Sequence, residues 1–285
     1  MQTTLDAATR DVATRTSLPL IATGRIFFAL GLIGMGATHF VFGDFMTGRA
    51  PPWPEQLAGG TAWAWTSGVV FICCGVAILV GRAMRVAALI TALLIICWAF
   101  ARNIPVAAAD SLFGGQWTRI GKAWTFAGGA LAVAAVAPRI ASVRGGLDSV
   151  LNATSAFTHA ARVLLALFLL VTGVQHFLHT GFVASLIPSW FPGDATFWTY
   201  SAGVALIAFG TGLLVAATAP IAALLAGCMV FSWFWIVHVP LTLTSVSDGV
   251  AVFEALAVAG IGLLLAGSLQ RGRWPRPAVG AGGRM

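Results

Sequence analysis

The chain has 285 residues, of which 59% are hydrophobic and 9% are charged, and its mean hydropathy is +0.91. Because a soluble domain carries about 25% charged residues, this composition excludes an ordinary water-soluble protein and indicates one built for lipid. The net charge of +7 does not indicate a nucleic-acid partner, since the basic residues lie at the ends of apolar stretches and form no stripe with interleaved aromatics. The four cysteines fall inside apolar runs without a metal-type spacing, so no disulfide chemistry is expected.

Apolar stretches of helical length follow one another along the whole chain. A helix of roughly 20 residues crosses the hydrocarbon core of a bilayer, and the chain has room for about eight such helices with short loops. We therefore predict an all-α, polytopic membrane protein with eight transmembrane helices in contact with the lipid bilayer, over residues 18–42, 61–81, 83–104, 120–137, 158–180, 197–217, 219–240 and 249–268.

The segments between these stretches differ in charge from one side to the other. Twelve of the sixteen Lys and Arg residues fall at the two termini and in alternate loops, whereas the remaining loops hold most of the acidic residues. Loops rich in Lys and Arg stay on the cytoplasmic side of a membrane. The sequence therefore predicts an even number of spans with both the N- and the C-terminus cytoplasmic.

The sequence also repeats itself. Adding 137 to the residue numbers aligns the first stretch and its loop with the fifth, so that His39 matches His176, and adding 135 aligns the following stretches, so that Pro105 matches Pro240. Each repeat holds four stretches, which predicts two tandem four-helix bundles related by an axis along the membrane normal. The predicted segments are a cytoplasmic N-terminal segment (1–17), a first repeat (18–140), a cytoplasmic linker (141–157), a second repeat (158–270) and a basic cytoplasmic tail (271–285).

Each repeat carries the same order of small motifs. An Arg-led first helix ends in Gly-x-x-His-Phe, a Pro-x-Trp loop follows, the second helix has Gly-Val near its start, and an Ala-rich third helix ends near Pro. This order resembles the DoxX-like family of four-helix membrane proteins, here as a tandem duplication that covers nearly the whole chain. The resemblance implies a multi-pass protein of the bacterial inner membrane. Relatives in that family include the small subunit of a thiosulfate:quinone oxidoreductase and a membrane subunit linked to disulfide formation.

The resemblance therefore implies a place close to quinone or sulfur redox chemistry. One departure limits what can be transferred. Many members of the family carry a Glu in the second helix, and the matching positions here are the apolar Phe71 and Leu206. The chain also lacks a cysteine pair for a thiol relay, so neither role is carried over.

Three histidines and a glutamate of the second half are predicted to converge at the outward face. His176 and His179 are three residues apart and share a helix face. His238 ends the seventh stretch at the same face, and Glu254 lies about one and a half turns into the eighth. Such a pocket suits a metal, a haem or proton transfer beside a quinone. The alternative is structural: each histidine bonds a carbonyl or water, and Glu254 pairs with a polar neighbour.

In the first half, His39, Arg102 and Asn103 lie at the place that matches this second-half pocket. A basic residue there suits an anionic group better than a metal, and the difference between the halves predicts that one kept a site while the other became structural. Trp53 and Trp190 lie in the outward loops, where indole rings anchor a protein at the interface. A stacking platform for a flat ligand, such as a quinone ring, is the alternative role for these two tryptophans.

These observations lead to one functional prediction and two alternatives. The prediction is a membrane subunit of a quinone- or sulfur-linked oxidoreductase, which works with a soluble subunit and binds a small hydrophobic ligand in an outward-facing pocket. The first alternative is a non-catalytic scaffold that recruits a soluble partner, and the second is a transporter of a small solute or a lipid. The sequence names neither the substrate nor the cofactor, with quinone and haem both open.

Overall fold

A computed structural model of the chain describes residues 2–45, 53–54, 57–109, 114–141, 145–243 and 249–272, and of residues 2–15 only the backbone. Within these ranges the regular structure is helical and contains no strand. The long helices are α1 (Gln2–Phe42), α2 (Gly60–Val80), α3 (Met84–Trp98), α5 (Gly114–Val136), α7 (Thr154–Leu178), α9 (Ala195–Leu214), α10 (Ala219–Trp233) and α12 (Gly249–Gly272). The short elements are η1 (Ala99–Asn103), α4 (Ile104–Ala109), α6 (Gly146–Leu151), α8 (Thr180–Ser185), η2 (Phe234–His238) and α11 (Val239–Thr242).

Seven helices among the described residues are long and apolar enough to cross a membrane. They cover Thr16–Phe42, Gly60–Val80, Met84–Ala109, Thr154–Leu178, Ala195–Leu214, Ala219–Thr242 and Gly249–Arg271. These helices coincide with seven of the predicted stretches, which confirms an all-α, multi-pass membrane protein. The remaining predicted stretch, 120–137, coincides with α5, which carries Arg119 and Lys122 in its first half and is less apolar.

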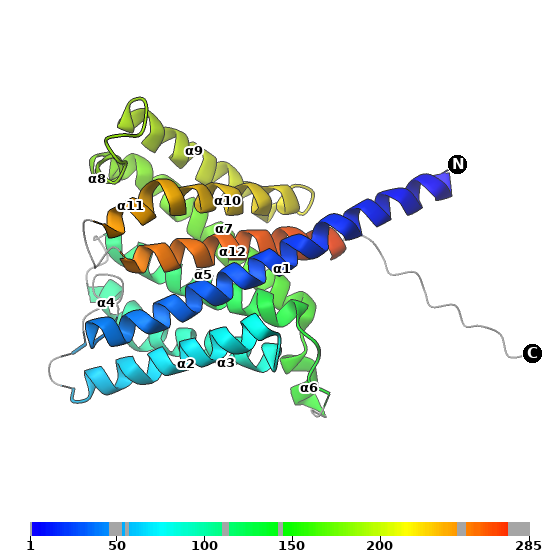
Figure 1. The fold of residues 1–285 in the computed structure, drawn as a ribbon, viewed down its shortest axis with the longest axis horizontal. Helices are drawn as coiled ribbons and strands as arrows, with labels where there is room; N and C mark the ends of the chain where they lie inside the picture. Colours follow the sequence, from blue (N-terminus) through cyan, green and yellow to red (C-terminus); the bar gives the residue numbers. More distant parts are fainter. Residues whose placement is uncertain are drawn as a thin grey trace, which may run out of the picture.

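The long helices pack in chain order, and the chain then closes on itself. The most extensive helix–helix interface joins α1 to α12, the first and last helices (Figure 1). In the same way α5 packs mainly on α7 and α3, and hardly on α1. The fourth helix of each predicted half therefore packs chiefly on the first helix of the other half, so that the two halves are interlocked.

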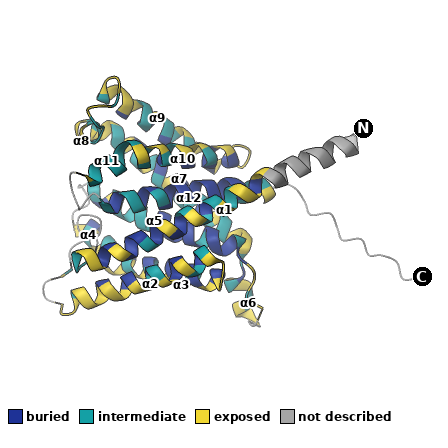
Figure 2. Cartoon of the chain, in the orientation of Figure 1, coloured by how far each residue is buried: buried dark blue, intermediate teal, exposed yellow. Residues whose placement is uncertain are grey.

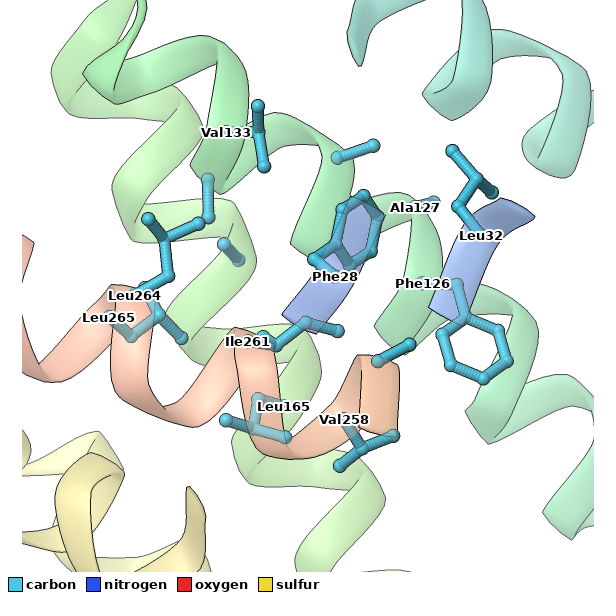
Figure 3. Packing of buried hydrophobic residues seen from close by; sticks show 14 of the residues in the cluster. Phe28, Leu32, Phe126, Ala127, Val133, Leu165, Val258, Ile261, Leu264 and Leu265 are labelled. Carbon is cyan, nitrogen blue, oxygen red and sulfur yellow. The ribbon is translucent and has the colours of Figure 1, made fainter. Parts of the chain in front are cut away.

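The hydrophobic core lies where these four helices meet. Phe28 of α1, Val133 of α5, Leu165 of α7 and Ile261 of α12 are each no more than 1% exposed, and Figure 3 shows them packed together. Figure 2 shows α12 as a mostly buried helix in the middle of the molecule, in agreement with its high share of buried residues. The centre of the protein is thus built jointly by both halves.

The α1–α12 interface depends on glycines that let the two backbones approach. A Cβ atom added at Gly24 would lie 2.6 Å from the carbonyl oxygen of Gly260, and one added at Gly260 would lie 2.6 Å from that of Gly24. Small residues serve this purpose in membranes, where the hydrophobic effect does not drive helices together. The atoms in the way belong to the backbone, so neither helix can yield by turning a side chain.

We expect Gly260→Ala to destabilise the folded protein, because the added methyl group forces α1 and α12 apart. Overpacking of this kind costs about 1–3 kcal/mol. Gly181 is the matched control, since a Cβ atom at this position of α8 meets nothing within 4 Å. Thermal unfolding in detergent should show a lower midpoint for Gly260→Ala and an unchanged or higher one for Gly181→Ala. A Gly260→Ala protein as stable as the wild type would contradict the tight packing.

One π-helical turn interrupts the third helix of each predicted half, and each of the two turns lies next to a proline. In η1 the N–H of Ile104 donates to the carbonyl of Ala99, five residues back, directly before Pro105. In η2 the corresponding bond runs from Val239 to the carbonyl of Phe234, before a second proline. Proline cannot donate a backbone hydrogen bond, so the ladder shifts by one residue, and such turns are frequent at functional sites.

The two ends of the molecule differ in the elements they carry. The end of α1 lies at the same end of the molecule as α4, α8 and α11, whereas the start of α1 lies at the opposite end, on the same side as α6 (Figure 1). We call the former the His39 end. The predicted tail beyond residue 272 and Pro51 of the first Pro-x-Trp loop lie outside the described residues.

Candidate functional site

The first component of the site is a histidine near the end of α1. His39 is 2% exposed, and its Nδ1 donates a hydrogen bond of 2.8 Å to the carbonyl oxygen of Met35, one turn back. The rings of Phe45 and Phe71 meet it edge-on, each with a centroid separation of 5.8 Å. Since a carbonyl only accepts, Nδ1 carries the hydrogen, and Nε2 is the nitrogen available to a ligand.

The π-helical turn η1 supplies a buried cation. Arg102 is 7% exposed, and its guanidinium carbon lies 4.2 Å from the ring centroid of Phe45, 5.3 Å from that of Trp53 and 6.0 Å from that of Trp98. A guanidinium over an aromatic face is stabilised by the ring quadrupole, by about 2 kcal/mol when desolvated. The aromatic residues thus hold Arg102 in place at the edge of the site.

The indole of Trp98 is itself fixed by a polar residue of α2. Its Nε1 donates a hydrogen bond of 3.0 Å to the hydroxyl oxygen of Ser67, which is 2% exposed. The indole also meets Phe45 at 4.9 Å and Trp53 at 6.0 Å, both edge-on. The π-turn and the adjoining part of α3 are therefore anchored to α2.

The fourth helices of both halves contribute an ion pair. Nζ of Lys122 in α5 lies 2.6 Å from Oε2 of Glu254 in α12, with 21% of the lysine side chain and 7% of the glutamate side chain exposed. One turn earlier in α5, Nη1 of Arg119 donates to Oε1 of Gln116 over 3.1 Å. The Lys122–Glu254 pair therefore joins α5 to α12.

These side chains surround one cavity of about 90 Å³ near the His39 end. Its walls are formed by α1, α2, α3 with η1, α5 and α12. Aromatic and aliphatic residues make up most of the lining, and the polar part consists of His39, Ser67, Arg102, Asn103, Arg119, Lys122 and Glu254. A space of this size holds several water molecules or one small solute.

The cavity gathers four of the predicted site residues, namely His39, Arg102, Asn103 and Glu254. A fifth, Trp53, lies beside them through its contact with Arg102. Glu254 was predicted to join the histidines of the second half, and the structure places it in the first-half cavity instead.

The remaining predicted residues lie elsewhere. His176 donates through Nδ1 to the carbonyl of Thr172 over 2.7 Å and stacks on Trp233 at 6.2 Å. His179 lies at the end of α7, close to Gly114. The residues that do not line the cavity are His176, His179, His238 and Trp190. Over the described ranges, no group of three or more His, Cys, Asp or Glu residues is placed to hold a metal ion.

Sequence reasoning missed three polar residues of the cavity, Ser67, Arg119 and Lys122. One signal was available: Lys122 is the single lysine of the chain, and it falls inside an apolar stretch. An ionisable group at such a position usually faces a cavity or a partner.

The comparisons with known proteins identify a family for this chain. No curated protein and no solved structure matches it. A family model described as "Domain of unknown function (DUF8561)" matches residues 28–123 and 165–266, together more than two thirds of the chain. The matched segments contain all seven polar residues of the cavity. The chain therefore belongs to the family described as Domain of unknown function (DUF8561).

Proposed function

We propose that this protein is a membrane-embedded binding protein for a small polar solute, which enters the first-half cavity from the outward side of a bacterial inner membrane. The observation that carries the proposal is the cavity itself: seven polar side chains from five helical segments converge on one space in an otherwise apolar bundle. Ionisable groups inside a membrane protein are costly and usually line a substrate or ion path.

The proposal includes an eight-span, duplicated architecture with both termini cytoplasmic. The two π-turns support the duplication, since both have five residues and start 135 positions apart, at Ala99 and Phe234. The two segments matched by the family model start 137 positions apart, which is the same offset that aligns the first predicted stretch with the fifth. His39 and His176 also make the same backbone bond, to the carbonyl four residues earlier.

We propose that α5, which corresponds to the predicted stretch 120–137, is the one remaining span. Its length of 23 residues is sufficient to cross a bilayer. Two of its charged residues, Arg119 and Lys122, line the cavity, so they need not face lipid. The distribution of Lys and Arg in the sequence supports the orientation, with the His39 end on the outward side.

The size of the cavity favours a small solute over the other candidates. A protein cavity of about 150 Å³ is the size that accommodates benzene, and drug-sized ligands occupy roughly 300–1,000 Å³. At about 90 Å³ the cavity is smaller than either of these, which favours a small solute over a quinone ring, a haem or a lipid chain. A scaffold without a ligand gives no reason for a buried polar cluster at this place.

A redox subunit, as the DoxX-like resemblance implies, is tested by an oxidised-minus-reduced absorption spectrum of the solubilised protein. We expect a featureless spectrum, because the size of the polar cavity favours a small solute over a haem or a quinone ring. A haem or quinone band that His39→Ala or His176→Ala removes would contradict the small-solute proposal and favour the oxidoreductase subunit.

Solute binding is tested by ligand-induced stabilisation. A ligand at 100 times its Kd stabilises a protein by about 2.7 kcal/mol, which raises the unfolding temperature. We would screen the purified protein against small anionic, neutral and cationic solutes and repeat each hit with His39→Ala and with its repeat counterpart His176→Ala. We expect His39→Ala to lose the shift and His176→Ala to keep it. Equal effects of both substitutions, or no shift with any class of solute, would overturn the proposal.

A further inference from the structure

The charged side chains that line the cavity are mostly cations, and the carboxylate of Asp44 lies near two of its polar residues, His39 and Arg102. The lining contains Arg102, Arg119 and Lys122 against the single carboxylate of Glu254. Arg and Lys side chains are hydrogen-bond donors without any acceptor. A ligand that fills this space must therefore offer acceptors, and negatively charged acceptors make the stronger bonds with such donors.

Both members of the ion pair line the cavity, and the lysine side chain is the more exposed of the two, at 21% against 7%. An ammonium group has three donor hydrogens, so Lys122 can bond Glu254 and a ligand at the same time.

Arg102 provides a second donor on another wall. Its guanidinium lies over the ring of Phe45, and the N–H groups of a stacked guanidinium point outward in its own plane. The apolar rings of Phe71 and Phe126 also line the cavity, which leaves it less polar than bulk water. Charge interactions are several times stronger in such a space than in bulk water.

We infer that the solute is a small monovalent anion of the size of formate or nitrate, held between Lys122 and Arg102, and that Glu254 lowers its affinity by competing for Lys122. This inference rests on the proposed function and names its ligand class. The contacts of the ion pair give the two members opposite roles: Lys122 attracts the anion, whereas Glu254 repels it and occupies one donor of Lys122.

Because Lys122 and Glu254 have opposite roles, substitutions at these two residues should change the Kd for the anion in opposite directions. We would measure binding of radiolabelled formate to the full chain in detergent by equilibrium dialysis, with neutral formamide and with tetramethylammonium as matched probes. Lys122→Met should raise the Kd for formate at least tenfold, and Glu254→Gln should lower it several-fold. His176 lies outside the cavity, so His176→Ala should leave the Kd for formate within twofold of the wild-type value.

The outcomes separate this inference from the proposed function. Formamide or tetramethylammonium bound as tightly as formate, in a manner that depends on His39, would overturn the anion class and keep the solute site. A Kd for formate that changes in the same direction in Lys122→Met and in Glu254→Gln would overturn the competition between Glu254 and the anion. Should Lys122→Met fail to fold, Glu254→Gln decides the competition alone, because damage to the fold cannot tighten binding. No binding of any probe would overturn the proposed function itself.

Discussion

Glu254→Ala will lower the free energy of unfolding by about 2–3 kcal/mol, because it leaves the ammonium group of Lys122 without the carboxylate that lies 2.6 Å away. Loss of one partner from a fully buried pair costs about 3–5 kcal/mol. The lower figure applies here since 21% of the lysine side chain remains exposed. The measurement is reversible unfolding in mixed detergent micelles.

The double substitution Lys122→Met with Glu254→Leu should regain most of this loss. Apolar residues of similar volume often replace a buried ion pair without a cost in stability. The exposed pair of Arg139 and Asp148 is the control, with its charges 3.6 Å apart and its side chains 68% and 40% exposed. We expect Arg139→Ala to change stability by less than about 1 kcal/mol. A double variant no more stable than Glu254→Ala would contradict the expectation that apolar side chains can replace the pair.

The second large effect is expected at Arg85, which is 3% exposed near the start of α3. Its guanidinium donates to the carbonyl oxygens of Ala137 at 2.7 Å, Pro138 at 3.0 Å and Leu151 at 3.3 Å, and to the hydroxyl of Thr154 at 3.4 Å. These groups lie at the end of α5 and around the linker before α7. A single side chain therefore ties α3 to the connection between the two halves.

We expect Arg85→Ala to destabilise the protein by about 3 kcal/mol or more, because each hydrogen bond from a charged group contributes about 1.5–3 kcal/mol and buried carbonyls lose their donor. Arg85→Lys should recover only part of this, since an ammonium group cannot reproduce the planar fork. The exposed neighbour Arg82 supplies the control, and Arg82→Ala should stay within about 0.5 kcal/mol of wild type. An Arg85→Ala protein of normal stability would show that the linker is held by other contacts.

Hydropathy predicted the helices well because the length of a membrane helix is set by the bilayer and its composition by lipid contact. The predicted stretch 249–268, for instance, corresponds to a helix over Gly249–Gly272. For the more polar α5 the sequence predicted a stretch over 120–137, whereas the helix begins at Gly114. Its first turns contain the polar Gln116 and the charged Arg119, so hydropathy alone did not extend the predicted stretch over them.

The position of Glu254 could not be predicted in the same way. The sequence repeat predicts that α12 is the fourth helix of the second half, but it does not predict which half α12 packs against. Close approach at Gly24 and Gly260 brings α12 to α1, and Glu254 then enters the cavity of the first half. The three histidines stay in the second half, where His176 stacks on Trp233.

The binding of an anion inside the first-half cavity is tested most directly by locating one. Crystals of the wild-type protein grown with bromide, a monovalent anion with a strong anomalous signal, would show its position. The account predicts an anomalous peak in the cavity between Lys122 and Arg102, which is absent from Lys122→Met crystals grown in the same way. Bromide found only on the outer surface, with none in the cavity, would contradict it.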